Sequence, residues 1–167
     1  MAGIFVFSEQ DRCAFELLSK AGELGKKMGL DIAAAALGGS QAEEYARRGC
    51  TRVYTSSHAL LRPFDAFVYA QTLSQIATMS QAKVILIGST RSGKELAGRL
   101  AQMLGAGCLT DCQSLEYEKE GLVATRNAFG GATVVVQKLT TGIQIYALRP
   151  YLFEPVAPGE AAGKVVQ

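Results

Sequence analysis

Residues 84–101, with the sequence VILIGSTRSGKELAGRLA, decide the fold class of this chain. The apolar β-formers at residues 84–87 predict a buried strand that ends at Gly88. A helix is predicted next, because Leu96 and Leu100 recur at the spacing of one helix face. A buried strand that leads directly into a helix is typical of an α/β protein with a parallel sheet.

The same alternation of strands and helices extends toward the N-terminus. Further strands are predicted where short apolar runs are bounded by polar residues or glycine, at residues 4–7, 32–37 and 52–55. Helical patterns separate them: a long helix that Gly29 ends, a short helix at about 41–48, and a longer helix that contains Phe67 and Ala77. Since the strands are apolar on both faces, we expect a parallel sheet with helices on both sides.

From residue 108 onward the pattern changes to closely spaced strands. They are predicted at residues 108–117, 122–128, 133–138 and 143–149. These strands leave no room for crossover helices, so we expect them to pair antiparallel at the edge of the sheet, the last two as a hairpin around Thr141 and Gly142. Residues 154–167 are rich in Pro, Gly and Ala, and we expect a flexible tail there.

The composition is that of a globular protein and excludes several classes of function. The chain has 167 residues, of which 49% are hydrophobic, and this length is usual for one domain. Its 17 basic and 15 acidic side chains form no basic stripe, so we expect no binding to nucleic acid. The start lacks the features of a secretory signal, and no apolar stretch approaches the ~20 residues that span a bilayer. We therefore expect a cytoplasmic protein without membrane insertion.

Neither the cysteines nor the histidine form a pattern typical of a metal or catalytic site. The four cysteines are too few for a disulfide framework. Cys108 and Cys112 belong to an extended segment, in which residues four apart are separated by roughly 13 Å, so we expect small buried thiols. His58 has no nucleophile at a diagnostic spacing, and we expect a surface or capping residue. We therefore predict no catalytic residue and no metal ligand.

The loop after residues 84–87 comes close to a phosphate-binding P-loop without completing it. Gly88, Gly93 and Lys94 match the pattern GxxxxGK, but a P-loop needs a Ser or Thr next, to hold magnesium, and this chain has Glu95. A nucleoside triphosphatase is therefore not favoured. The loop still places backbone N–H groups at a helix N-terminus, which is a general site for anions.

The loops that follow other strands would meet this loop at one edge of the sheet. Open α/β sheets bind ligands beyond the carboxyl ends of their strands, and we predict that a nucleotide or another anion binds at this edge. The candidate binding residues are Ser8, Gly38, Gly88, Ser89, Thr90, Arg91, Gly93 and Lys94. The alternative is that the glycines only form tight strand-to-helix turns, and the sequence leaves both interpretations open.

Arg126 and Arg149 form a separate pair of candidates. Each lies in a predicted strand among apolar or small residues. A charge in such a place requires a partner. A structural ion pair and a role in an interface are both open for each of them.

The chain as a whole resembles the N-terminal domain of the electron transfer flavoprotein alpha subunit. The most specific block is residues 84–111, where VILIGSTRSGKELAGRLA and LGAGCLTD are similar to the family's strand, turn and helix and to the segment that follows them. TRNAFGG at residues 125–131 and ALRP at residues 147–150 are similar to two later strands of the family. The similarity covers about residues 3–153.

This resemblance implies an α/β fold of the Rossmann-like, adenine nucleotide alpha hydrolase-like type: a parallel sheet with helices on both faces and added antiparallel edge strands. It also implies pairing with a beta subunit and the carriage of electrons from dehydrogenases. In the family, FAD sits chiefly in a second, C-terminal domain, which follows the strand that ALRP resembles. We therefore expect residues 1–153 to form the N-terminal-like domain and the FAD-binding domain to be absent from this chain.

We expect an accessory or partner domain in flavin-based electron transfer, with no catalytic activity of its own. Its expected partners are a beta-like subunit of the electron transfer flavoprotein or a separate flavin-binding module, and a homo-oligomer is also open. FAD is the cofactor that the resemblance implies. The alternative is a stand-alone domain that binds AMP or another nucleotide and has no role in electron transfer.

Overall fold

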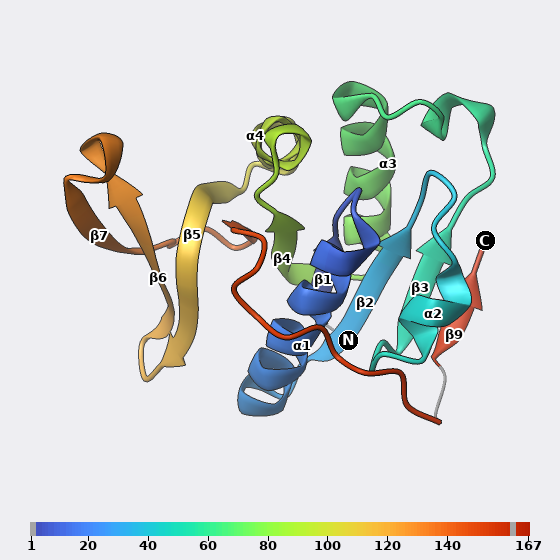
Figure 1. Ribbon diagram of the computed structural model, residues 1–167, viewed down its shortest axis with the longest axis horizontal. Helices are drawn as coiled ribbons and strands as arrows, with labels where there is room; N and C mark the ends of the chain where they lie inside the picture. Colours follow the sequence, from blue (N-terminus) through green and yellow to red (C-terminus); the bar gives the residue numbers. More distant parts are fainter. Residues whose placement is uncertain (1–2, 161–162) are drawn as a thin grey trace.

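Nine strands form one sheet in the computed structural model of the chain, which describes residues 3–160 and 163–167 (Figure 1). In their order across the sheet, the strands are β7 (Thr133–Lys138), β6 (Gly121–Ala128), β5 (Gly107–Glu118), β8 (Gln144–Leu148), β4 (Ala82–Gly88), β1 (Gly3–Phe7), β2 (Asp31–Ala36), β3 (Arg52–Thr55) and β9 (Lys164–Val166). All neighbours from β5 to β9 in this order pair parallel, whereas β6 pairs antiparallel with β5 and with β7. The predicted α/β class, with antiparallel strands at one edge, is confirmed.

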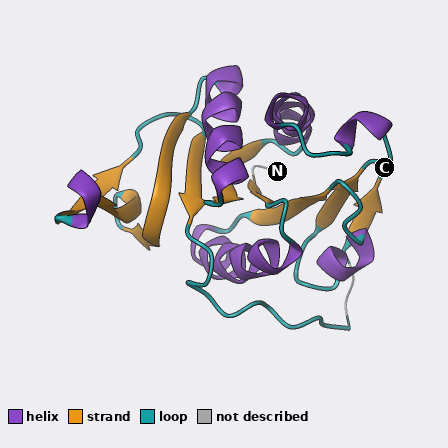
Figure 2. Cartoon of the chain, turned by 45° about the horizontal axis from the view of Figure 1, so that its top comes forward, coloured by secondary structure: helices purple, strands orange, loops and turns teal. Residues whose placement is uncertain are grey.

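Within the described residues, four α-helices cover the two faces of the sheet (Figure 2). One face is covered by α1 (Asp11–Met28) and α2 (Ala42–Ala46), and the other by α3 (Ala66–Met79) and α4 (Arg91–Leu104). Two short 3-10 helices, η1 (Ala59–Leu61) and η2 (Phe129–Gly131), lie in the connections. In this described part of the chain, no helix has both the length and the apolar character that crossing a membrane requires.

Strand β1 shows why an unbroken apolar run becomes a central strand. All of its residues are buried. Ile4 and Val6 pack into the core beneath α1 and α2, whereas Phe5 and Phe7 pack into the core beneath α3 and α4. Side chains alternate between the two faces along a strand, so a strand that is covered on both faces has to be apolar throughout.

The predicted hairpin between the last two strands is wrong. Strand β8 does not pair with β7 but lies between β4 and β5, parallel to both. Residues 145–148 are buried on both faces, as a central strand requires, whereas Val134 and Val136 of β7 are exposed. The turn signal at Thr141 and Gly142 bends the chain without joining two paired strands, because pairing partners are set by burial across the whole sheet.

Residues 154–160 and 163–167, which belong to the predicted flexible tail, make specific contacts with the rest of the chain. The backbone N–H groups of Val156 and Gly159 donate to the carbonyls of Phe15 and Arg47. The guanidinium of Arg48 stacks on the ring of Phe15 at 3.9 Å and donates to the carbonyl of Val156. Strand β9 then pairs with β3 at the edge of the sheet. Backbone hydrogen bonds hold this segment, and its composition does not reveal them.

We expect the amide protons at residues 145–148 to exchange with solvent only through global unfolding of the chain. Both edges of β8 are bonded within the sheet, whereas β7 has one free edge and should exchange faster through local opening. Native-state hydrogen exchange followed by NMR measures both strands in the same sample, so β7 serves as the internal control. Equal, fast exchange of β7 and β8 would contradict the central position of β8.

Candidate functional site

The candidate site lies at the carboxyl edge of the sheet, between β1 and β4. The chain runs from β1 through β2 to β3 in one direction and then returns to form β4 on the other side of β1. Ligands of open α/β sheets bind beyond the strand ends at such a switch point. The pairing of Phe7 with Ile87 brings the two loops that follow, residues 8–10 and 88–90, next to each other.

Gly88 at the end of β4 and Gly93 in the first turn of α4 allow unusually close packing. A Cβ atom on Gly88 would lie 2.6 Å from the Sγ of Cys13 and 2.7 Å from the Oγ of Ser8. A Cβ atom on Gly93 would lie 1.8 Å from the carbonyl oxygen of Gly88, a backbone atom that has no freedom to move aside. The turn from β4 into α4 therefore requires glycine at position 93, whether or not a ligand binds, and a larger residue at position 88 would have to displace the side chains of Cys13 and Ser8.

A carboxylate lies over the N-terminus of α4. The Oγ1 of Thr90 accepts from the backbone N–H of Gly93 at 2.9 Å and so caps the helix. The same hydroxyl donates a hydrogen bond to the carboxylate of Glu9, which follows Ser8 at the end of β1. A negative charge is favourable at this place because the helix dipole is positive at its N-terminus. In this structure the chain itself supplies that charge.

A second carboxylate, that of Asp111, binds the other side of the same loop. The Oγ of Ser89 accepts from the backbone N–H of Asp111 at 3.0 Å and donates to its Oδ1 at 3.3 Å. The Nζ of Lys94 lies 3.4 Å from Oδ2 of the same carboxylate. Asp111 has a φ of 57°, a left-handed conformation at the point where the pairing of β5 with β8 is interrupted. The loop thus bonds to β5 as well as to β1.

Carboxylates therefore use the side-chain donors that the sequence assigns to a bound anion. A phosphate at this loop would meet the charges of Glu9 and Asp111 and would compete with them for Ser89, Thr90 and Lys94. Neither carboxylate is among the site residues that the sequence predicts. Glu9 had a detectable signal, because it lies two residues after a predicted strand. Asp111 lies inside a predicted strand and is marked only as the last residue of the segment LGAGCLTD.

The remaining candidates of the predicted anion site lie apart from this network. Gly38 follows β2, so β1 separates it from the loop after β4. Its φ of 67° is left-handed, and a Cβ atom there would lie 2.4 Å from the hydroxyl of Tyr69. Arg91 is exposed in the first turn of α4. The structure thus groups Ser8 with the loop after β4 and places Gly38 at a different part of the edge.

Arg126 and Arg149 have no ion-pair partner among residues 3–160 and 163–167. Arg126 is half-buried in β6, and Arg149 is exposed just after β8. The backbone N–H of Arg149 donates to the carbonyl of Cys112 at 3.0 Å. The backbone of Arg149 is thus bonded to β5, while the residue is exposed to solvent. A role of either arginine in an interface stays a prediction.

His58 is an exposed capping residue, as the sequence predicts. It precedes η1, and its Nδ1 accepts from the backbone N–H of Leu60 at 3.2 Å. The structure describes no group of three or more His, Cys, Asp or Glu side chains that could hold a metal ion, in the residues outside 1–2 and 161–162. The described contacts of His58 give it no nucleophile to activate.

The four cysteines are free, and three of them are buried. Burial raises the pKa of the Cys13 thiol to about 11 and the pKa of the Cys50 and Cys112 thiols to about 12. The half-buried Cys108 also has a raised pKa, from the same cause. These thiols are protonated at neutral pH and are poor nucleophiles and metal ligands in that form.

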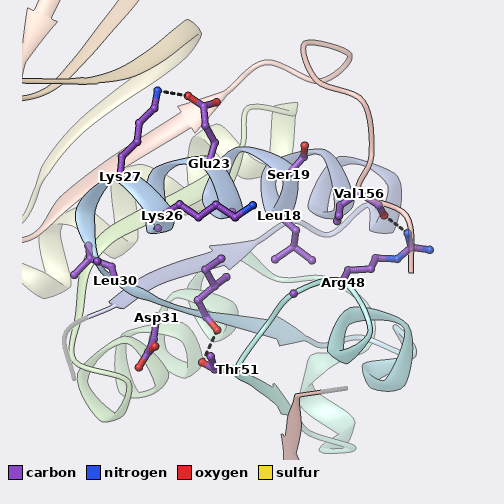
Figure 3. A pocket seen from close by; sticks show the side chains of 15 residues that line it. Leu18, Ser19, Glu23, Lys26, Lys27, Leu30, Asp31, Arg48, Thr51 and Val156 are labelled. Atoms are coloured by element: carbon purple, nitrogen blue, oxygen red, sulfur yellow. Dashed lines mark hydrogen bonds and ion pairs between the residues drawn. The ribbon is translucent and has the colours of Figure 1, made fainter. Parts of the chain in front are cut away.

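Figure 3 shows a cavity of about 930 Å³ at the amino ends of the strands, on the edge of the sheet opposite the candidate site. It lies along α1, at the amino end of β2 where Asp31 is found. Its polar groups are partly paired with one another: Glu23 and Lys27 point toward each other, and Arg48 donates to the carbonyl of Val156. Because the cavity lies away from the switch point, we do not place the candidate site there.

The family model and the curated relatives that match this chain point to the same protein family. The model of the "Electron transfer flavoprotein domain" family matches residues 4–167. The electron transfer flavoprotein subunit alpha of Clostridium acetobutylicum is 31% identical, and the match covers 95% of this chain and 51% of that protein. Protein FixB of Clostridium saccharobutylicum is 29% identical over 98% of this chain and 52% of its own length. This chain spans about half the length of these curated relatives.

We expect Gly93→Ala to lower the free energy of unfolding by at least about 1–3 kcal/mol, because the Cβ atom of the new alanine would press on the carbonyl of Gly88. Gly98→Ala is the matched control, since Gly98 lies on the exposed side of the same helix with nothing within 4 Å of a Cβ atom. That substitution should stabilise the protein by about 0.5–1 kcal/mol. Urea unfolding measures both variants, and equal stability of the two would contradict the described turn.

We expect the free energy of unfolding to fall as the pH rises above about 9. The buried thiols stay protonated in the folded state, whereas the unfolded chain releases their protons near the ordinary cysteine pKa of 9.0. The stabilisation is complete below that value and is lost progressively toward pH 12, by at most about 1.4 kcal/mol per thiol and pH unit.

The variant Cys112→Ala isolates one of these thiols. Between pH 8 and pH 10 its unfolding free energy should fall by about 1 kcal/mol less than that of the wild-type chain, measured by urea unfolding. Lysines and tyrosines titrate equally in both proteins and cancel in the difference. An identical decrease in the two proteins would show that burial of Cys112 is not a cause of the alkaline destabilisation.

Proposed function

The chain belongs to the electron transfer flavoprotein domain family, and we propose that it serves as the alpha-type component of an assembly for flavin-based electron transfer. The family match over residues 4–167 carries this proposal, and the alpha subunits and FixB proteins among the relatives support it. In this role the chain binds and orients partner proteins and catalyses no reaction alone. The alternative of an isolated nucleotide-binding domain is not favoured by these comparisons.

The family is a flavoprotein family, so the residues at the switch point require a test against a flavin dinucleotide. The pyrophosphate of such a cofactor carries negative charge and needs free donors at a helix N-terminus. At the N-terminus of α4, Glu9 already binds Thr90, and Asp111 already binds Ser89. These residues do not fit the cofactor. We therefore assign flavin binding to protein outside these residues, for example to a separate flavin-binding module.

An exposed apolar surface at the β7 end of the sheet supports the need for a partner. Phe129 is 86% exposed, Val134 60% and Val136 65%. The two valines are two residues apart in one strand and so share a face. Strand β7, which carries both valines, lies at the end of the sheet opposite β9 (Figure 1). Grouped exposed apolar side chains are typical of surfaces that another protein covers. We assign this surface to a beta-like subunit.

The test uses the full chain, the beta-like subunit and the flavin-binding protein from the same source. Size-exclusion chromatography with detection of flavin absorbance should show a joint complex that contains flavin, whereas the chain alone should be colourless. Absence of any association would contradict the proposed role. A stoichiometric flavin in the chain alone would contradict the assignment of flavin binding to other protein.

We expect Val136→Glu to weaken binding of the beta-like subunit by roughly tenfold or more, because it places a charge in an apolar interface. Met79→Glu is the matched control, since Met79 is 63% exposed, close to the 65% of Val136, but lies at the end of α3. This second variant should bind like the wild-type chain. Isothermal titration calorimetry measures both, and equal affinities of the two variants would exclude the β7 surface.

A further inference from the structure

A polar cavity of about 460 Å³ opens at the carboxyl ends of β2 and β3. Three segments line it: residues 38–40 after β2, residues 55–58 after β3, and residues 59, 61 and 62 in and after η1, together with Gln167. None of these side chains is acidic, whereas two of them, His58 and Arg62, are basic. Its volume is within the range of small-molecule sites. This cavity plays no part in the proposed function.

Arg62 supplies an unneutralised positive charge to this cavity. No carboxylate forms an ion pair with it in residues 3–160 and 163–167. Gly39, with a φ of 104°, gives the guanidinium room to lie against the backbone, because a Cβ atom there would be 2.1 Å from Nη2. The flat, forked guanidinium is the side chain best suited to binding a phosphate through two hydrogen bonds.

Further donors come from the loop after β3. The Nδ1 of His58 accepts a hydrogen bond from the backbone N–H of Leu60, so the neutral ring carries its proton on Nε2 and donates from there. The Oγ of Ser56 accepts from the backbone N–H of His58, which leaves its own proton available. Ser57 adds another hydroxyl to the lining. These groups line the same cavity as Arg62.

One carboxylate lies next to the cavity, and its charge is met by hydroxyl groups of the protein. Asp11 is the carboxylate bonded to a lining residue, and it accepts from the hydroxyl of Ser40 at 2.6 Å and from the hydroxyl of Tyr45 at 2.7 Å. Both hydroxyls donate to Asp11, so its charge is already solvated within the protein. The edge of the sheet thus differs along its length. Carboxylates use the donors of the loop after β4, whereas at β2 and β3 the hydroxyl of Ser40 is used in this way and Arg62 forms no ion pair in the part of the chain that the structure describes.

We propose that this cavity binds the phosphate group of a small phosphomonoester, with Arg62 as the charged partner and with His58, Ser56 and Ser57 as hydrogen-bond donors. The group would lie at the carboxyl edge of the sheet, the general position of ligands in open α/β folds. The cavity is larger than one phosphate requires, so it accommodates an organic portion of the ligand against Gly38 and Leu61.

NMR titration of the ¹⁵N-labelled full chain at constant ionic strength tests this proposal. The probes are inorganic phosphate, ribose 5-phosphate and a nucleoside 5′-monophosphate, with chloride as the reference anion. Saturable shifts should concentrate at residues 38–40 and 55–62, and the organic phosphate that fits the cavity should bind more tightly than inorganic phosphate. Shifts that are absent, or that chloride reproduces, would overturn the proposal.

Two exposed arginines provide a matched pair of variants. Arg62→Gln should weaken phosphate binding roughly tenfold or more, because it removes a charged donor. Arg91→Gln should leave the affinity unchanged, since Arg91 lies beside the loop after β4. Circular dichroism confirms that both variants fold. If Arg91→Gln weakened binding and Arg62→Gln did not, the anion would bind at the glycine loop, and the site proposed here would be wrong.

Discussion

The backbone pairing of β8 with β4 and with β5 holds the two halves of the sheet together. Its side chains contribute to both cores: Tyr146 and Leu148 belong to the core beneath α1 and α2, and Ile145 and Ala147 to the core beneath α3 and α4. The strand also holds the loop after β4 in place, because the carbonyl of Leu148 accepts from the backbone N–H of Ser89 at 2.7 Å. Without β8, the loop after β4 would lose this bond, and β5 would not bring Asp111 to it.

The sequence predicted local structure well but placed the last of the closely spaced strands, β8, wrongly, for a physical reason. Apolar runs and helical stripes reflect burial of a single segment, so the strands near residues 4–7, 52–55 and 84–87 and the helices between them were recovered. Strand partners depend on the whole sheet, so β8 was wrongly expected in a hairpin. In the site, glycines are visible as single residues, whereas Glu9 is 81 residues from its partner Thr90 and Asp111 is 22 from Ser89.

A glycine-rich turn with a lysine therefore does not by itself define an anion site. Its backbone geometry is one requirement, and unoccupied donors are another. The turn after β4 meets the first requirement, but the chain supplies its own carboxylates. At β2 and β3 the loops contain no such motif, yet they leave an arginine and several hydroxyls without acidic partners. The distribution of acidic side chains along the strand ends, more than the motif, separates these two parts of the edge.

The position of β8 also imposes an order on synthesis of the chain. Strands β4 and β5 leave the ribosome before β8, and the position between them in the sheet stays empty until residues 144–148 have been made. During that interval β4 has an unpaired apolar edge, which is the kind of surface that promotes aggregation. Contacts between segments so distant in sequence also slow folding. Nascent chains that stop before β8 are thus the forms of this protein with the greatest need for chaperones.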